Sequence, residues 1–405
     1  MKINLPDDVK FIINTLTEHG YEAYAVGGCV RDSIIRREPG DWDITTSAKP
    51  QEVKALFRRT IDTGIQHGTV TVMLKKTGYE VTTYRVDGEY EDGRHPKNVE
   101  FTASLTEDLK RRDFTINAMA YNDYEGIVDE FGGKDDLQNG IIKCVGNPED
   151  RFGEDALRML RAVRFSAQLG FEIEHNTADA IRKLAPSIAK ISKERIHTEF
   201  AKLLLSPHPD YMSKVCELGI AAVVFKPFDD IEDKTISYRM LNYVPDELYF
   251  RYAALLYSCT DKETGKILRE LKLDNNTINK TVCLVKNHGI AITDDEYDVR
   301  CCANEISPSG LADVLSFEEC FYKAVGNAES AKAAHKEREM LDKIIERGDC
   351  LSIHGLAVSG KDLMDLGVAQ GCVVGQMLRY CLDIVLKEPS RNTKEKLVEA
   401  IMSRK

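Results

Sequence analysis

Two aspartates separated by one residue, Asp41 and Asp43, are the first residues in the chain whose spacing suggests chemistry. Side chains two positions apart on a β-strand point to the same face, so a strand here would place both carboxylates close together. Carboxylates at that separation repel each other and are stable in the ionised form only with a cation between them. Oxygen ligands of this kind suit Mg²⁺ that also binds phosphate oxygens. The alternative is a pair of solvated aspartates in the turn that follows Pro39 and Gly40.

Two features near this pair favour the metal-binding interpretation. Gly27 and Gly28 form a turn between an apolar run and a helical segment, where the backbone can approach a phosphate and Arg31 can help to hold it. A Gly-Gly pair alone is more often an ordinary turn, and this one lacks the further residues of a dinucleotide fingerprint or a P-loop. Glu80, within the strand-like run 79–83, adds a third carboxylate. Two carboxylates on one strand and one on a neighbouring strand would form a site for two metal ions.

Arg112 and Asp113 form a second candidate site. Arg112 can bind a phosphate through two parallel hydrogen bonds, and Asp113 can accept a hydrogen bond from a ribose hydroxyl. The alternative is a charged helix N-terminus, where the helix dipole favours an aspartate.

A row of charged residues that begins at Asp155 is the third candidate. On a helix, Asp155 and Arg158 would lie one turn apart and face the same way, and Arg161 and Arg164 would continue the row. Such a row is ordinarily a solvated face with salt bridges, so the spacing alone does not identify a binding site.

The elements that must position these residues are of two kinds. The first 140 residues indicate an α/β region, with a helix from Val9 to His19 and strands at 69–74 and 79–85, where Thr and Val alternate. The polar stretch between Arg85 and Val99 predicts a mobile loop. From Asp155 onward the apolar residues have helical spacing almost to the end.

Composition narrows the class of protein. The chain has 405 residues, of which 43% are hydrophobic, so general disorder is excluded. No run approaches the roughly 18 apolar residues that a membrane span needs, and the N-terminus has no secretory signal, so we expect a cytoplasmic protein. Eleven scattered cysteines without zinc spacing predict reduced thiols. A net charge of −11 neither predicts nor excludes RNA binding.

Five segments, in this order and spacing, resemble the class II tRNA nucleotidyltransferases. These are the CCA-adding enzymes of the DNA polymerase β superfamily, with close poly(A) polymerase relatives. The C-terminal segment 359–385 resembles the tail of the Gram-positive bacterial type. The five segments are 27–44, 79–85, 111–121, 151–165 and 191–204.

The resemblance implies an α+β fold, in which a polymerase β-type head with a small sheet is followed by an all-helical neck, body and tail. The implied domains are the nucleotidyltransferase head at 1–140, the base-selecting neck at 141–206, the body at 207–305 and the tRNA-binding tail at 306–405.

The resemblance also implies roles for the candidate residues. Positions that match Asp41 and Asp43 bind the metal ions, and the position that matches Glu80 is the third carboxylate. The residues that match positions holding nucleotide phosphates and ribose are Gly28, Arg31 and Arg112.

The pair that matches Asp155 and Arg158 reads the incoming base in this family, and Arg161 and Arg164 match further nucleotide-binding positions. This is chemically reasonable, because cytosine and adenine present an amino donor to the carboxylate and a ring-nitrogen acceptor to the guanidinium. Uracil and guanine reverse both polarities, at about 1–3 kcal/mol for each mismatched group.

We therefore expect a CCA tRNA nucleotidyltransferase that uses Mg²⁺ to add CMP, CMP and AMP, from CTP and ATP, to the tRNA 3′ end without a template. The stretch from Arg85 to Lys97 resembles the loop with which CCA-adding members switch from CTP to ATP. Three alternatives remain: an A-adding enzyme, a bacterial poly(A) polymerase and a non-catalytic RNA-binding homologue. The sequence does not indicate the oligomeric state.

Overall fold

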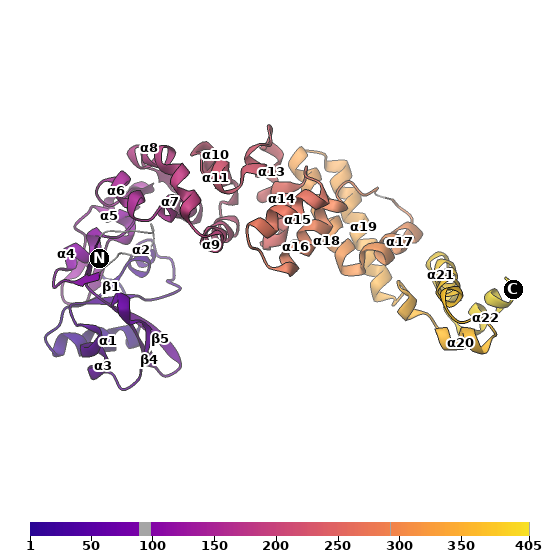
Figure 1. The fold of residues 1–405 in the computed structure, drawn as a ribbon, viewed down its shortest axis with the longest axis horizontal. Helices are drawn as coiled ribbons and strands as arrows, with labels where there is room; N and C mark the ends of the chain where they lie inside the picture. Colours follow the sequence, from indigo (N-terminus) through magenta and orange to yellow (C-terminus); the bar gives the residue numbers. More distant parts are fainter. Residues whose placement is uncertain (89–98, 292, 405) are drawn as a thin grey trace. The chain divides into compact units, whose positions relative to one another are not determined.

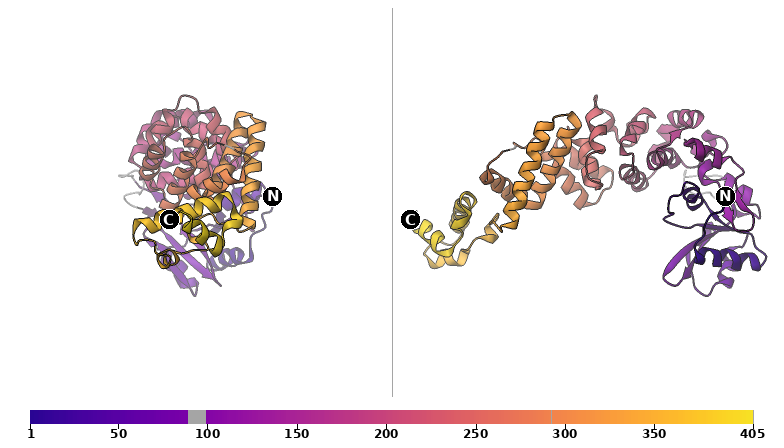
Figure 2. Two further views of the ribbon diagram at one scale, coloured as in Figure 1. Left: turned by 90° about the vertical axis from the view of Figure 1, so that its right-hand side faces the viewer. Right: turned by 180° about the vertical axis from the view of Figure 1, so that it is seen from behind.

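The computed structural model describes residues 1–88, 99–291 and 293–404. Contacts group the chain into two compact units, Met1–Glu232 and Asp233–Lys405. The first unit combines a sheet with helices, whereas the described part of the second unit is built from helices (Figure 1, Figure 2). The prediction of an α+β head followed by a helical remainder is confirmed.

A mixed sheet organises the first unit, with the strand order β3-β4-β5-β2-β1-β8-β9. Strands β2 and β5 are parallel, and the other neighbouring pairs are antiparallel. The predicted strand 69–74 is confirmed as β4, and the predicted strand 79–85 is β5, which begins at Thr77 and ends at Thr83. The strands are β1 (Ala23–Val26), β2 (Ile44–Thr46), β3 (Thr60–Gly64), β4 (Thr69–Leu74), β5 (Thr77–Thr83), β8 (Ala120–Asn122) and β9 (Gly126–Val128).

Short helices accompany this sheet. The predicted helix 9–19 is confirmed as α1 (Asp7–Glu18), which buries Val9, Ile12 and Leu16 on one face. It begins directly after Pro6, and two aspartates in its first turn favour the positive end of the helix dipole. The other helices of the head are α2 (Gly28–Ile34), α3 (Pro50–Leu56), α4 (Leu105–Lys110) and α5 (Gly133–Asn139).

The rest of the first unit is helical apart from one small pair of parallel strands. Helix α7 is largely buried and packs against α9. The elements are β10 (Ile141–Ile142), α6 (Pro148–Glu154), α7 (Leu157–Leu169), β11 (Glu172–Ile173), α8 (His175–Leu184), α9 (Lys193–Leu204), α10 (Met212–Glu217), α11 (Ala221–Val224) and α12 (Lys226–Asp229).

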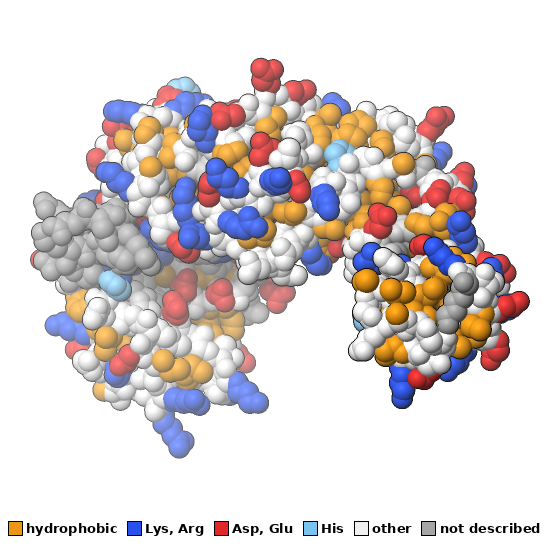
Figure 3. Space-filling model, turned by 45° about the vertical axis from the view of Figure 1, so that its right-hand side comes forward, with side chains coloured by type: hydrophobic (Ala, Val, Ile, Leu, Met, Phe, Trp, Pro, Cys, Tyr) orange, Lys and Arg blue, Asp and Glu red, His pale blue; other side chains and the backbone are white. Residues whose placement is uncertain are grey.

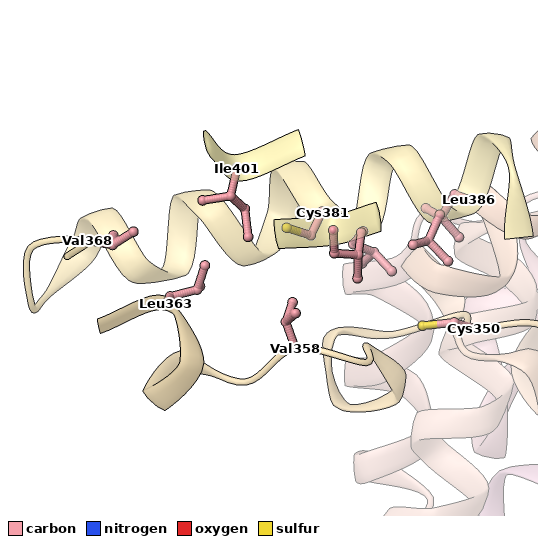
Figure 4. Packing of buried hydrophobic residues seen from close by; sticks show 10 residues of the cluster. Cys350, Val358, Leu363, Val368, Cys381, Leu386 and Ile401 are labelled. Carbon is pink, nitrogen blue, oxygen red and sulfur yellow. The ribbon is translucent and has the colours of Figure 1, made fainter. Parts of the chain in front are cut away.

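Hydrophobic cores hold the helices of the second unit together. One core joins α17, α18 and α19 through residues such as Val299, Leu315 and Ile344. A second core lies within the last 56 residues of the chain and includes Leu363, Cys381 and Ile401 (Figure 4). The helices are α13 (Thr235–Leu241), α14 (Leu248–Leu256), α15 (Asp261–Glu270), α16 (Asn275–Lys286), α17 (Glu296–Ile306), α18 (Pro308–Val325), α19 (Ala328–Glu346), α20 (Gly360–Asp365), α21 (Cys372–Lys387) and α22 (Lys394–Met402).

The division into head, neck, body and tail remains a prediction. The contacts separate the chain between Glu232 and Asp233. The core shared by α17, α18 and α19 spans the predicted boundary between residues 305 and 306.

The polar stretch after Arg85 begins with a strand, which the predicted loop did not include. Residues Arg85–Asp87 form strand β6, which pairs antiparallel with β7 (Val99–Phe101). The segment 89–98, which includes most of the stretch that resembles the nucleotide-switching loop, lies outside the described residues.

Three observations made from the composition concern the charge, the cysteines and membrane spans. Lys and Arg side chains are interspersed with Asp and Glu side chains on the face shown in Figure 3. All eleven cysteines are free, as predicted. Among the described residues, every helix is too short or too polar to cross a membrane.

A buried carboxylate in the second unit leads to a prediction about pH. Glu337 on α19 is 4% exposed, and its Oε1 accepts a hydrogen bond from the Thr293 amide at 3.3 Å. Burial raises the pKa of Glu337 to about 7, and the neighbouring carboxylates of Asp294 and Asp298 contribute to the rise. Because the folded state binds this proton more tightly than the unfolded state, stability is lost as the pH rises from the ordinary glutamate pKa through 7.

We therefore expect Glu337→Gln to gain stability relative to the wild type as the pH increases. Between pH 5 and pH 8.5 the difference in unfolding free energy should move in favour of the variant by about 1–3 kcal/mol, since a shift of one pKa unit corresponds to about 1.4 kcal/mol and partial solvation reduces it. Hydrogen exchange of α19 peptides at both pH values measures this difference. Glu346→Gln, which alters an exposed carboxylate at the end of the same helix, should show no such change, and an equal response of both variants would contradict the assignment.

Candidate active site

Three carboxylates of the head, those of Asp41, Asp43 and Glu80, line one cleft. The parallel pairing of β2 with β5 brings them together, because Ile44 lies opposite Val81 and the residues before each are therefore neighbours. All three side chains are exposed to solvent. The cleft has a volume of about 500 Å³ and is also lined by Gly40, Trp42, Thr77, Gly78 and Tyr79.

The expectation that Asp41 and Asp43 lie on one strand is wrong. Strand β2 begins at Ile44, and both aspartates lie in the segment that leads into it. The carbonyl oxygen of Asp43 nevertheless accepts a hydrogen bond from the Val26 amide at 3.0 Å. The sheet therefore fixes Asp43 through its backbone, one residue before the regular strand.

The electrostatics of the cleft are those of a site with excess negative charge. Although Asp43 is accessible to solvent, the surrounding protein partly desolvates its carboxylate and raises its pKa above the usual range, and Glu80 and Asp41 raise it further. The guanidinium of Arg112 opposes this rise. A cation in the cleft would relieve the repulsion among the carboxylates.

The donor set fits a hard divalent cation in kind, because it consists of carboxylate oxygens that face solvent. Within the described residues, no group of three or more His, Cys, Asp or Glu side chains is placed to hold a metal ion. Mg²⁺ is usually bound by one or two carboxylates together with waters and substrate phosphates. The cleft is therefore compatible with a metal that takes its remaining ligands from a substrate.

The glycine pair forms the turn between β1 and α2. Gly27 has a φ of 82°, a left-handed conformation that favours glycine, and Gly28 is the first residue of α2. A Cβ atom at Gly27 would lie 3.1 Å from Nη1 of Arg112. A glycine at this position thus permits both the turn and the close approach of the arginine.

Arg31 is buried beneath this turn, with an exposed fraction of 7%. Its Nε and Nη2 atoms lie 2.9 and 2.8 Å from Oδ1 of Asp32. Its Nη1 donates to Oδ1 of Asn117 at 2.6 Å. These partners hold the guanidinium in place, and its role in phosphate binding stays a prediction.

Asp113 is buried and ion-paired. Its Oδ2 accepts hydrogen bonds from Nε and Nη2 of Arg161 at 2.9 and 2.6 Å, and its Oδ1 accepts one from Asn117 at 3.2 Å. Burial alone would raise the pKa of Asp113, but the Arg161 guanidinium holds it well below its usual range. The carboxylate is therefore ionised and joins the segment after α4 to α7, and its contact with a ribose hydroxyl stays a prediction.

Arg164 belongs to a cluster of arginines around one aromatic ring. Its guanidinium carbon lies 3.7 Å from the centre of the Phe165 ring, and those of Arg31 and Arg161 lie at 5.1 and 5.3 Å. Burial lowers the pKa of Arg164 to about 10, and the Glu199 carboxylate, 2.7 Å from its Nε, opposes this effect. The ring and Glu199 together hold three like charges close to one another.

Asp155 and Arg158 do not lie on one helix, contrary to the expectation. Helix α6 ends at Glu154, Asp155 has an extended backbone, and α7 begins at Leu157. Oδ1 of Asp155 accepts a hydrogen bond from the Leu157 amide at 3.0 Å. The aspartate thus satisfies the first free N–H group of α7, a position that the helix dipole also favours.

Each member of this pair is held by an opposite charge. Nη2 of Arg195, on α9, lies 2.7 Å from Oδ2 of Asp155. Nη1 of Arg158 donates to Oε2 of Glu154 at 2.5 Å, and its Nη2 donates to the Arg111 carbonyl at 3.1 Å. The two side chains are therefore fixed in position.

Several partners of the candidate residues were not predicted from the sequence, among them Asn117, Arg195 and Glu199. Asn117 lies 86 positions after Arg31, and Arg195 lies 40 positions after Asp155. The available signal was the spacing of Arg195 and Glu199, four positions apart, which places both on one face of α9.

Comparison with known proteins gives a consistent result along the chain. Residues 23–143 match the family model of the poly(A) polymerase head domain. Residues 170–231 match a model described as "Probable RNA and SrmB- binding site of polymerase A". Residues 250–401 match a model of tRNA nucleotidyltransferase domain 2.

Individual relatives match almost the whole chain. A CCA-adding enzyme of Anoxybacillus flavithermus is 38% identical over 404 residues, which cover 96% of this chain and 95% of the relative. One from Leuconostoc mesenteroides is 40% identical and covers 92% and 90%. The crystal structure of the Bacillus stearothermophilus CCA-adding enzyme in complex with CTP is similar with a TM-score of 0.78, at 35% identity and 97% coverage of both chains.

Proposed function

The chain belongs to the family of CCA-adding enzymes, in the type found in Gram-positive bacteria, and we propose from this that it completes the 3′ end of tRNA. It is a nucleotidyltransferase that adds CMP, CMP and AMP, from CTP and ATP, without a template and with release of pyrophosphate. The observation that carries this function is the match to CCA-adding enzymes over almost the full length of both chains.

We assign the chemistry to the cleft of Asp41, Asp43 and Glu80. Asp41 and Asp43 would hold Mg²⁺, with Glu80 facing the same cleft from β5. Bound there, the metal would supply charge neutralisation for the departing pyrophosphate and would favour the ionised form of the attacking 3′-hydroxyl. The cleft is open to solvent and is thus accessible to a triphosphate and to the end of an RNA chain.

Arg112 is suited to the triphosphate. Its guanidinium lies against the Gly27 turn. Its positive charge lowers the pKa of the Asp43 carboxylate, which lines the cleft. We propose that Arg112 and the Gly28 turn hold phosphate oxygens, with Arg31 fixing the turn from below.

Asp155 and Arg158 would select the base. An ionised Asp155 only accepts hydrogen bonds and Arg158 only donates them, which matches the edges of cytosine and adenine and excludes those of uracil and guanine. Arg195 and Glu154 hold the two side chains in fixed positions, so the pair does not need to reorganise for either base.

The remaining assignments are also proposals. Residues 1–140 would carry out catalysis, 141–206 would select the nucleotide, 207–305 would form a helical body, and 306–405 would contact the acceptor arm of tRNA. Since every tRNA must be accepted, the protein should recognise the shape and the sugar-phosphate backbone of the tRNA more than its base sequence. We place the protein in the cytoplasm, where its substrates are found.

A primer-extension gel at single-nucleotide resolution tests the function. Purified protein and Mg²⁺ are incubated with tRNA transcripts that end before CCA or after CC, with each labelled nucleotide in turn. Two CMP and one AMP followed by a stop support CCA addition. AMP alone on the CC end indicates an A-adding enzyme, a long A ladder indicates a poly(A) polymerase, and no incorporation by folded protein leaves only an RNA-binding homologue.

A further inference from the structure

Asp108, the fourth residue of α4, is a fully buried carboxylate that contacts Arg112, the arginine proposed to bind the triphosphate. Its Oδ1 accepts hydrogen bonds from Nε and Nη2 of Arg111 at 3.0 and 2.8 Å. Its Oδ2 accepts one from Nη2 of Arg112 at 3.4 Å. One buried anion therefore holds two consecutive guanidinium groups.

The same carboxylate is anchored to the strand that follows Asp43. The hydroxyl of Thr45, in the centre of β2, donates to Oδ2 of Asp108 at 3.1 Å, and the Arg85 amide donates to Oδ1 at 3.4 Å. Thr45 is itself fully buried. Asp108 thus connects the strand that positions Asp43 directly to Arg112.

Among the described residues, Arg112 has few other contacts that would fix the direction of its guanidinium. Its Nη1 lies near the Gly27 turn, and its Nε is buried without a hydrogen-bond partner in the described structure. The positive charge of Arg112 also lowers the pKa of Asp43, so the two side chains attract each other. Without the charge of Asp108, the guanidinium would therefore be drawn more strongly towards Asp43, whose carboxylate it already stabilises.

Asp108 is ionised, as its contacts with two arginines require. Burial alone would raise its pKa, but Arg112, Arg111 and the Thr45 hydroxyl hold it below the usual range. An ionised carboxylate that is completely buried is costly unless its partners are fixed around it. Its position is thus determined by the arginines and the strand that it joins.

We propose that Asp108 is a positioning residue for nucleotidyl transfer, which holds Arg112 at the triphosphate and keeps it from pairing with Asp43. This inference rests on the proposed function, because it assigns Arg112 to the triphosphate. Asp108 itself is buried and does not touch the substrate.

Asp108→Asn tests the proposal, because it preserves the shape of the side chain and removes its charge. We expect kcat/KM to fall at least tenfold, and by the same factor for CTP and ATP, since the triphosphate is common to both. Asp62→Asn is the matched control, because Asp62 forms an exposed ion pair with Lys54 in the same domain, and this variant should keep the wild-type rate. An Asp108→Asn variant with more than half of the wild-type activity would overturn the proposal.

A double-mutant cycle separates positioning from general stabilisation. In an Arg112→Ala background, Asp108→Asn should cost less than twofold, because the group through which Asp108 acts is gone. Losses that multiply would overturn the proposal. Should Asp108→Asn fail to fold, Thr45→Val takes its place in the same cycle: its loss of rate should disappear in the Arg112→Ala background, and an unchanged loss would overturn the proposal.

Binding of CTP provides a readout that does not depend on catalysis. Trp42 is the only tryptophan of the chain and lines the cleft, so its fluorescence should report CTP. Asp108→Asn should weaken CTP binding at least tenfold, and equal affinities in the variant and the wild type would overturn the proposal. If the wild type binds CTP but incorporates nothing, the proposed function fails, and this binding comparison still decides the role of Asp108.

Discussion

Asp43→Asn is expected to reduce nucleotide incorporation by about a thousandfold or more, which corresponds to about 4 kcal/mol of transition-state stabilisation. The amide keeps the size of the side chain but removes the charge that a divalent cation needs. Because the cleft raises the pKa of Asp43, the ionised side chain costs folding energy at neutral pH. The variant should therefore be at least as stable as the wild type.

Single-turnover incorporation of labelled CMP, together with thermal unfolding, measures both effects. Asp41→Asn should lose incorporation to a similar extent, because Asp41 lines the same cleft. Asp135→Asn, which changes an exposed aspartate on α5, is the control and should retain full activity. An Asp43→Asn variant with more than a tenth of the wild-type rate would refute the assignment of the metal site, and removal of divalent cations by a chelator should abolish incorporation by the wild type.

The sequence predicted the carboxylates of the cleft better than the element that carries them. Asp41 and Asp43 were identified from their spacing, and Glu80 from its place in a strand-like run. A parallel pairing of β2 with β5 brings them together, and no local pattern specifies which strands become neighbours. The two aspartates precede β2, as is common for aspartates, which favour turns over strand interiors.

The row from Asp155 to Arg164 shows a second limit of local patterns. Its spacing fits a helix, but the side chain of Asp155 bonds to the Leu157 amide and thus ends the helical path between α6 and α7. Short polar side chains compete in this way with helical hydrogen bonds. The helix of Arg158, Arg161 and Arg164 was predicted, whereas the break before it was not.

Partners that are distant in the chain were beyond prediction. Spacing identifies which residues share a face of one element, but Arg31 is held by Asn117 and Asp155 by Arg195 through tertiary packing alone. The division into a first region with strands and a helical remainder, in contrast, followed from patterns that repeat along many residues, such as the Thr and Val alternation of β4 and the apolar face of α1. The α+β class itself was implied by the family resemblance.

The second large effect concerns nucleotide selection, where Arg158→Ala is expected to lower the preference for CTP over UTP by about 10- to 100-fold. Arg158 would satisfy a ring-nitrogen acceptor of cytosine, and in the wild type it opposes the ring N–H of uracil at a cost of about 1–3 kcal/mol. Removing the guanidinium deletes both the favourable contact with cytosine and the unfavourable contact with uracil. The rate with CTP should therefore fall, and the rate with UTP should rise. The dependence on Mg²⁺ concentration should not change, because Arg158 is held by Glu154 and the Arg111 carbonyl rather than by the carboxylates of the cleft.

Competition between labelled CTP and UTP on a tRNA that ends before CCA measures this preference directly. Arg182→Ala removes an arginine whose ion pair with Asp179 lies on the surface of α8, and it should leave the preference unaltered. Asp155→Asn provides the complementary case, because an amide both accepts and donates hydrogen bonds and can therefore turn a donor towards uracil. The preference of Asp155→Asn for CTP over UTP should therefore fall. Its rate with CTP should fall less than that of Arg158→Ala. If both variants lost activity with CTP and UTP in equal proportion, Asp155 and Arg158 would support the fold of α6 and α7 without reading the base.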